Sequence, residues 1–120
     1  MQLLSHMANE STDPLSPLFS ALADPTRRAV IQALGDGPKP VSTLADTHDM
    51  ALPSFLKHLD KLEQAGVIRS HKQGRVRTCH LNPEALTPVQ GWLDRERGRW
   101  SGRLDRLSNH LDALNKDLKQ

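Results

Sequence analysis

The chain has 120 residues, enough for one domain with a modest hydrophobic core, and its formal net charge is only +2. It has no apolar run of about 18 residues and no secretory signal at its start, so the sequence predicts no membrane span. The single cysteine, Cys79, excludes an internal disulfide and favours a cytoplasmic setting. Two tryptophans, two phenylalanines and no tyrosine argue against a protein that stacks single-stranded bases.

The N-terminal part predicts a polar tail followed by two short helices. Residues 1–13 are polar and aperiodic, which is typical of a disordered tail. Leucine and phenylalanine recur at helical spacing within residues 14–23, which predicts the first helix. The next two residues, Asp24 and Pro25, supply an N-cap and a first-turn proline for a second helix over residues 26–34.

Two arginines stand at an unfavourable place in that second helix. Arg27 and Arg28 fall in its first turn, where the helix dipole disfavours cations. We therefore expect them to have a structural purpose, such as an ion pair with Asp24 or with a neighbouring acid.

A short helix at residues 42–47, a turn at residues 49–51 and a longer helix form a helix-turn-helix pattern. The longer helix has Pro53 in its first turn and ends at Gly66, where a left-handed cap is expected. Apolar residues spaced by four and three predict its buried face, and the opposite face is polar and cationic. By itself the polar face is more typical of a solvated helix surface. The buried residues are Phe55, Leu59 and Leu62, and the opposite ones are Ser54, Lys57, Lys61 and Gln64.

A basic hairpin follows the helix-turn-helix pattern. Residues 67–81 read as two strand-like runs about a Lys-Gln-Gly turn and contain no acid. Across residues 57–80 there are six Lys/Arg against two acids, a concentration that indicates a polyanionic partner. Arg75 and Arg77 flank Val76, so we expect both side chains on the same strand face near the hairpin tip.

The last predicted helix, residues 88–118, is long and carries a heptad pattern. It would span about 45 Å at a rise of roughly 1.5 Å per residue. Such a helix cannot bury its whole apolar stripe on a small domain, so the pattern favours pairing with a second copy of the chain. Packing on the first helix of the same chain is the alternative. One seven-residue repeat consists of Leu93, Trp100, Leu107 and Leu114. The other consists of Leu104, Leu111 and Leu118, and Arg97 interrupts it one heptad earlier.

Three segments in this order carry a family resemblance: LADPTRRAVIQAL, LPSFLKHLDKLEQAGVI and GRVRTCHLNPEAL. Together they resemble the ArsR/SmtB family of bacterial winged-helix repressors over roughly residues 18–107. The run WLDRERGRWSGRLDRL, residues 92–107, is similar to one branch of that family. The resemblance implies a mainly α (α+β) fold, a winged helix-turn-helix with a two-stranded β wing, and a dimeric transcriptional regulator. We expect a DNA-binding domain over residues 14–87, followed by a dimerisation helix over residues 88–118.

Metal and redox chemistry find little support in the sequence. Metal-sensing members of the family place cysteines on the helix before the recognition helix, or paired Asp and His ligands on the last helix. Here TLADTHDM contains no cysteine and His110 stands alone, so we expect no metal or other cofactor. Arg77 and His80 could lower the pKa of Cys79, although a lone strand cysteine is more often inert. No catalytic triad, carboxylate pair or phosphate-binding loop appears, so we expect no enzyme.

The leading hypothesis is a homodimeric repressor that binds a pseudo-palindromic operator in double-stranded DNA. The alternatives are a winged-helix module for protein interactions, and a repressor that senses redox state or metal through an unrecognised site. For His58 the resemblance suggests packing or a phosphate contact. Candidate DNA contacts are Ser54, Lys57, His58, Lys61, Arg75 and Arg77. Candidate dimer contacts are Leu93, Trp100, Leu104, Leu107, Leu111 and Leu114.

Overall fold

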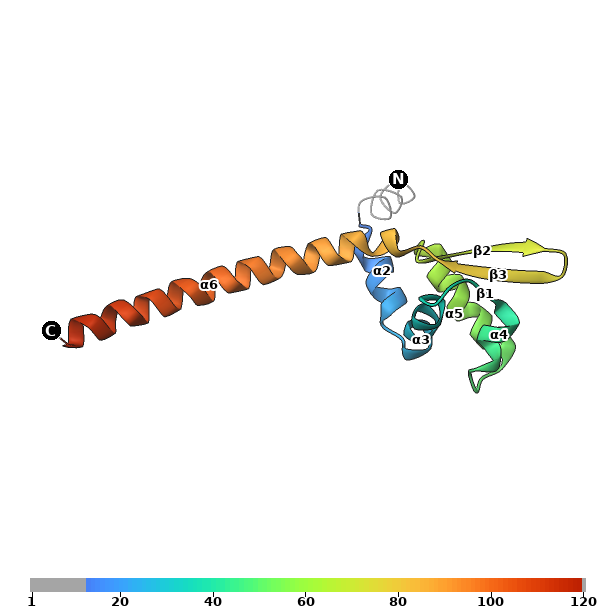
Figure 1. Ribbon diagram of the computed structural model, residues 1–120, viewed down its shortest axis with the longest axis horizontal. Coiled ribbons are helices and arrows are strands. Elements are labelled where there is room, and N and C mark those ends of the chain that lie inside the picture. Colours follow the sequence, from blue (N-terminus) through green and yellow to red (C-terminus); the bar gives the residue numbers. More distant parts are fainter. Residues whose placement is uncertain (1–12, 120) are drawn as a thin grey trace, which may run out of the picture. The chain divides into compact units, whose positions relative to one another are not determined.

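The computed structural model describes residues 13–119, so of the expected N-terminal tail only Asp13 falls within the described residues. The chain divides into two compact units, one ending at Val89 and the other beginning at Gln90. The elements are α2 (Leu15–Leu22), α3 (Pro25–Leu34), β1 (Lys39–Pro40), α4 (Val41–Asp46), α5 (Leu52–Gln64), β2 (Ile68–Gln73), β3 (Val76–Leu81), the 3-10 turn η1 (Pro83–Leu86) and α6 (Thr87–Lys119) (Figure 1).

The first unit has one hydrophobic core, to which the helices and the sheet both contribute. The predicted stripe of α5 is fully inside, because Phe55, Leu59 and Leu62 are each at most 1% exposed. These side chains pack with apolar residues of the other elements, so α5 is held by its inner face and presents its outer face to solvent. The other fully or nearly fully buried residues are Leu18, Ala21, Val30, Leu34, Leu44, Val67, Ile68, Cys79 and Val89.

Both ends of the predicted recognition helix form as the sequence indicates. Pro53 lies in the first turn of α5, where a missing N–H costs no hydrogen bond. At the other end Gly66 adopts a positive φ of 79°. Its N–H donates to the Glu63 carbonyl at 2.9 Å, and the Val67 N–H donates to the Leu62 carbonyl at 3.0 Å. This is the Schellman arrangement, and it turns the chain directly from α5 into the wing.

The wing is a hairpin of β2 and β3, and a third strand extends it. In the antiparallel order β1-β3-β2, Lys39 pairs with Cys79 and Pro40 pairs with Thr78. The sequence does not predict this strand, because two residues that include a proline give no strand pattern. Pro40 is tolerated because β1 is an edge strand. On the open side of an edge strand, a missing backbone N–H breaks no hydrogen bond of the sheet. The short strand connects the base of the wing to α4, which follows it at once.

Arg27 and Arg28 are structural, as expected, and their guanidinium groups donate to backbone carbonyls, while Arg27 also lies near enough to Asp24 to help lower the pKa of that carboxyl. Arg27 donates from Nε to the Ala21 carbonyl at 2.9 Å and from Nη2 to the Ser20 carbonyl at 2.7 Å. Arg28 donates to the Leu22 carbonyl at 2.8 Å. The cations therefore cap the C-terminus of α2, where carbonyls lack helical partners and the dipole favours positive charge.

The second unit is the body of α6, which has 33 residues in all. Its heptad residues are exposed in the single chain, with Trp100 at 67% and Leu104 at 64%. Within residues 13–119, no helix combines the length and the apolar character needed to cross a membrane.

Candidate nucleic-acid interface

The outer face of α5 carries most of the predicted contacts. Ser54, Lys57 and Lys61 are all exposed and lie on the side of the helix opposite its core stripe. Asp60, which is also exposed, lies between the two lysines on this face and was not among the predicted site residues. A carboxylate repels phosphate but accepts a hydrogen bond from a cytosine amino group. The face thus holds two cationic donors, a hydroxyl that both donates and accepts, and one carboxylate acceptor, at positions from which side chains of a recognition helix reach base edges.

The wing is fastened to α5 by one polar cluster, which we name the wing clasp: Glu63, Ser70 and Arg77. Arg77 donates from Nη2 to Glu63 Oε2 at 2.7 Å and from Nε to Ser70 Oγ at 2.9 Å. Ser70 in turn donates its hydroxyl and its backbone N–H to Glu63 Oε1, at 2.7 and 3.2 Å. The clasp sets the position of β2 and β3 relative to α5.

The two wing arginines do not share a strand face, which corrects the prediction made from their spacing. Gln73 pairs with Val76, so Gly74 and Arg75 form a two-residue turn and β3 begins only at Val76. Gly74 has a φ of 64° at the first central position of this turn, where a type II′ hairpin uses glycine. Arg75 is therefore a tip residue, whereas the guanidinium of Arg77 is held in the wing clasp.

Cationic side chains at the wing tip remain free of protein partners. In the described part of the chain, neither the Arg75 nor the Lys72 side chain has an ion pair or hydrogen bond, and both are exposed. Lys72 was counted in the sequence only as part of the basic run. With Arg77 held by Glu63, Lys72 and Arg75 are the cations of the wing tip that are available to a phosphate.

His58 lies on the side of α5 that faces α3. Its Nδ1 is 3.0 Å from Arg27 Nη1 and 3.7 Å from Asp24 Oδ2, and its side chain is 24% exposed. Asp24 accepts from the Arg27 N–H at 3.1 Å as the N-cap of α3. Although desolvation opposes it, that backbone bond and the nearby His58 lower the pKa of Asp24. These contacts support the packing alternative for His58.

Cys79 is fully buried beneath the wing. Burial raises the pKa of its thiol, and this outweighs the opposing effect of Arg77. A buried thiol with a raised pKa holds little thiolate at neutral pH, which is the opposite of what a redox sensor requires. Among residues 13–119, no three His, Cys, Asp or Glu side chains come together in a way that could hold a metal ion.

A helix-turn-helix with a fixed basic wing defines the class of winged helix-turn-helix DNA-binding proteins. A family model described as a helix-turn-helix domain matches residues 22–71. The transcriptional repressor SdpR of Bacillus subtilis is 32% identical over 79 residues, which cover 66% of this chain and 88% of SdpR. The chain belongs to the ArsR family of transcriptional regulators, because it is 55% identical to a crystallised member of that family, of which it covers 91%.

Solved structures agree with this assignment. The crystal structure of an ArsR family transcriptional regulator, RHA00566, has a TM-score of 0.71 and 55% sequence identity, covering 73% of this chain and 91% of that one. A homodimeric winged helix-turn-helix DNA-binding domain from Mycobacterium bovis, Mb0332, has a TM-score of 0.59 and covers 80% of this chain and 89% of its own. At 17% identity it shows the common fold only.

Proposed function

We propose that this ArsR-family regulator acts as a homodimeric repressor that binds a pseudo-palindromic operator, with α5 in the major groove and the wing tip on the flanking backbone. The observation that carries the proposal is the exposed face of α5, with Ser54, Lys57 and Lys61, beside wing cations that have no protein partner. Such a helix fits the major groove of B-DNA, and unpaired cations suit phosphates.

Each side chain has a role that follows from its position. Lys57, one turn into the exposed face, is the candidate to read a guanine through O6 and N7. Ser54 reaches most base edges and therefore discriminates poorly, while Lys61 contacts a phosphate or a base. Arg75 and Lys72 form a sequence-independent clamp at the wing tip. Arg77 positions the wing through the wing clasp.

Homodimerisation rests on the exposed heptad residues of α6. Leu107, Leu111 and Leu114 are each about half exposed in the single chain. A leucine stripe repeated every seven residues is stable in water when a second helix covers it. Two copies related by a two-fold axis would present two recognition helices, which explains the expected symmetry of the operator.

The proposal predicts modest sequence specificity, concentrated at one or two guanines per half-site. The first turn of α5 offers Leu52, Pro53 and Ser54, which make few bidentate base contacts, each worth about 1–3 kcal/mol of discrimination. Binding-site selection on randomised DNA with wild type and Lys57→Ala tests this. The variant should lose preference at a guanine and keep the half-site spacing. An unchanged motif would mean that Lys57 contacts only phosphate.

A salt titration separates DNA binding from a role in protein interaction alone. Affinity for the selected operator should fall steeply with salt, with a log–log slope of about −0.9 for each neutralised phosphate. Arg75→Ala should weaken binding to operator and random DNA alike and make the slope shallower by about one contact. A chain that selects no DNA motif, and whose weak binding is insensitive to salt, would contradict the proposed function.

A further inference from the structure

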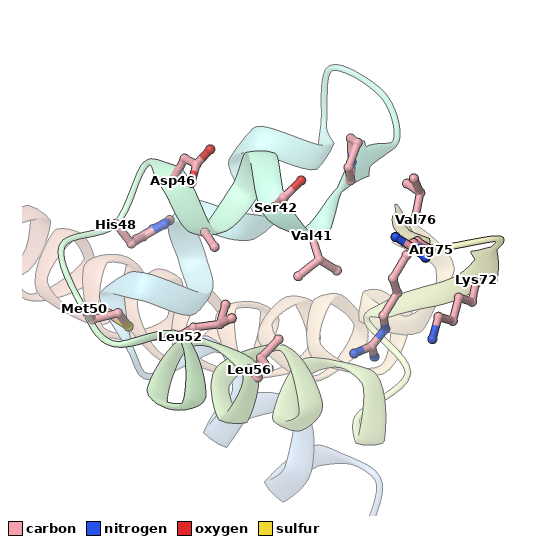
Figure 2. Close-up of a pocket in the computed structure, with 13 residues that line it drawn as sticks. Val41, Ser42, Asp46, His48, Met50, Leu52, Leu56, Lys72, Arg75 and Val76 are labelled. Carbon is pink, nitrogen blue, oxygen red and sulfur yellow. The ribbon is translucent and has the colours of Figure 1, made fainter.

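An open groove lies between the helix-turn-helix and the wing, on the flank of α5 rather than on its outer face. Its volume is about 800 Å³, within the roughly 300–1,000 Å³ that is usual for ligand pockets. Figure 2 shows its three sides: α4 with Val41, Ser42 and Asp46, the α5 side with Leu52 and Leu56, and the wing with Lys72, Arg75 and Val76. All of these residues belong to the first compact unit.

The inner surface of the groove is apolar although it is open to solvent. Leu52 is 53% exposed, Leu56 36% and Val76 51%. Val41 and Met50 line the same space and are partly buried against the core. Three large apolar side chains exposed in one concavity cost free energy in water, and such a surface gains stability when an apolar group covers it.

The charges of the groove are arranged at opposite ends. On the wing side, Lys72 and Arg75 have no partner within the described residues, while Arg77 is neutralised by Glu63. On the helix side the lining residues include one acid, Asp46, and no lysine or arginine. His48 there is held by the Thr47 hydroxyl and the Leu44 carbonyl, each at 3.0 Å.

We propose that this groove binds an organic monoanion with an elongated apolar body, of the class of free medium-chain monocarboxylates. The carboxylate lies against Lys72 and Arg75, and the chain covers Leu52, Leu56 and Val41. Asp46 at the far end disfavours a second negative charge, so the site selects one-headed acids. The carboxylate and a DNA phosphate use the same two cations, so ligand and DNA exclude each other. This second statement rests on the proposed function.

The test uses octanoate, decanoate and dodecanoate below their micellar concentrations, titrated into the full chain by calorimetry. We expect saturable binding of one molecule per chain, tightening by up to about four-fold for each methylene added. Decanol and decanedioate are the matched controls: the first lacks the charge and the second places a carboxylate against Asp46. Both should bind at least ten-fold more weakly than decanoate. Equal binding of decanol, or no saturation with any acid, overturns the proposal.

Two variants assign the binding to the groove. Leu52→Ser and Val76→Ser both change residues that are more than half exposed, so the fold should tolerate them. Each should weaken decanoate binding about ten-fold, and Val76→Ser, which changes no residue of the proposed DNA contacts, should leave operator affinity in place. Lys57→Ala, on the outer face of the same helix, should weaken operator binding and leave decanoate binding unchanged. If both groove variants bind decanoate as wild type does, the site lies elsewhere and the inference is wrong.

Competition is measured by anisotropy of a labelled operator. Decanoate should release wild-type protein from DNA, and Val76→Ser should need about ten-fold more acid for the same release. DNA binding that persists at saturating decanoate overturns the mutual exclusion. A protein that binds decanoate but no operator would instead contradict the proposed function and leave the ligand site standing, so the two failures are distinguishable.

Discussion

The ion pair between Glu63 and Arg77 shows that the cations of the basic run do not all have the same role. In the sequence Arg77 is one of six cations between residues 57 and 80. In the structure its guanidinium donates to Glu63 and to Ser70, and both charged side chains are only about one-third exposed, at 37% and 32%. The Nε and Nη2 groups of Arg77 thus donate to the protein itself. We therefore propose that Arg77 contributes to DNA binding by placing the wing beside α5.

If Arg77 positions the wing through the wing clasp, its removal should have effects that the loss of a phosphate contact would not have. Arg77→Ala and Glu63→Ala should each destabilise the fold, and the double variant should lose less than the sum, with a coupling of about 1 kcal/mol. Both variants should weaken operator binding, because the wing loses its fixed position. Chemical denaturation of the four proteins gives the coupling, and a salt titration gives the number of phosphate contacts.

Glu63→Ala is the decisive member of this cycle. If Arg77 bound phosphate and Glu63 merely stood nearby, removing the carboxylate would strengthen DNA binding, and Arg77→Ala would flatten the salt slope. The positioning role requires weaker binding from both changes with little change in slope. A tighter-binding Glu63→Ala protein would show that the wing needs no clasp.

At the scale of elements, Arg27 joins three helices. Its guanidinium lies at the start of α3, donates to two carbonyls at the end of α2 and contacts His58 of α5. Three bonds from one planar group explain why an arginine is placed where the dipole of its own helix opposes it. The recognition helix is thereby held from its α3 side as well as by the wing clasp.

Arg27→Lys should therefore be destabilising although it keeps the charge. Lysine lacks the planar fork and cannot make the three contacts together, so we expect a loss of about 2 kcal/mol in the free energy of unfolding. Arg28→Lys is the matched control, since Arg28 makes a single bond to a carbonyl and is exposed. Urea denaturation of the two variants measures the difference. Equal losses would mean that charge alone matters at the end of α2.

Elements with strong local signals could be predicted from the sequence, and those set by tertiary contacts could not. The stripe of α5, its first-turn Pro53 and the cap at Gly66 follow from periodicity and backbone chemistry. β1 could not be found, because its two residues become a strand only by pairing with β3. The turn position of Arg75 depends on hairpin register, which two strand-like patterns leave uncertain by a residue or two.

In the candidate DNA-binding site too, local patterns predict some positions and tertiary contacts decide the others. Ser54, Lys57 and Lys61 were expected on the outer face of α5, and helix geometry alone suffices to put them there. The partners of Arg77 and His58 are 14 and 31 residues away in sequence, and no local pattern indicates such pairs. The groove between α4, α5 and the wing is likewise a product of three separate elements.

For the whole molecule, the two units carry different parts of the proposed function. The recognition helix and the wing belong to the first unit, whereas the leucine stripe runs along the second unit. We expect the first unit by itself to bind DNA weakly, because a single recognition helix with few bidentate contacts binds one half-site poorly. Two linked half-sites add their binding free energies, less the cost of ordering the pair. Dimerisation should therefore control operator affinity far more than affinity for random DNA.

Replacing Leu104 and Leu111 by Glu tests this directly. Both residues belong to one repeat of the stripe and are more than half exposed in the single chain, so the monomer should stay folded. Glutamates at paired core positions of a coiled coil bury uncompensated charge, so we expect monomers by sedimentation at concentrations where wild type is dimeric. Trp100, in the other repeat, should report the change as a red-shifted emission, since the partner helix no longer covers it.

The matched control puts the same charge on the other side of α6. Asn109 and Ala113 lie off the stripe and are exposed, and the Asn109→Glu, Ala113→Glu protein gains the same two carboxylates. It should remain dimeric and keep its operator affinity, apart from the small repulsion that added acids exert on DNA. The stripe variant should bind random DNA nearly as well as this control does and should lose its preference for paired half-sites. If the stripe variant still sediments as a dimer, the leucine stripe of α6 is not the dimer interface. In that case α6 gives no reason to expect a symmetric operator.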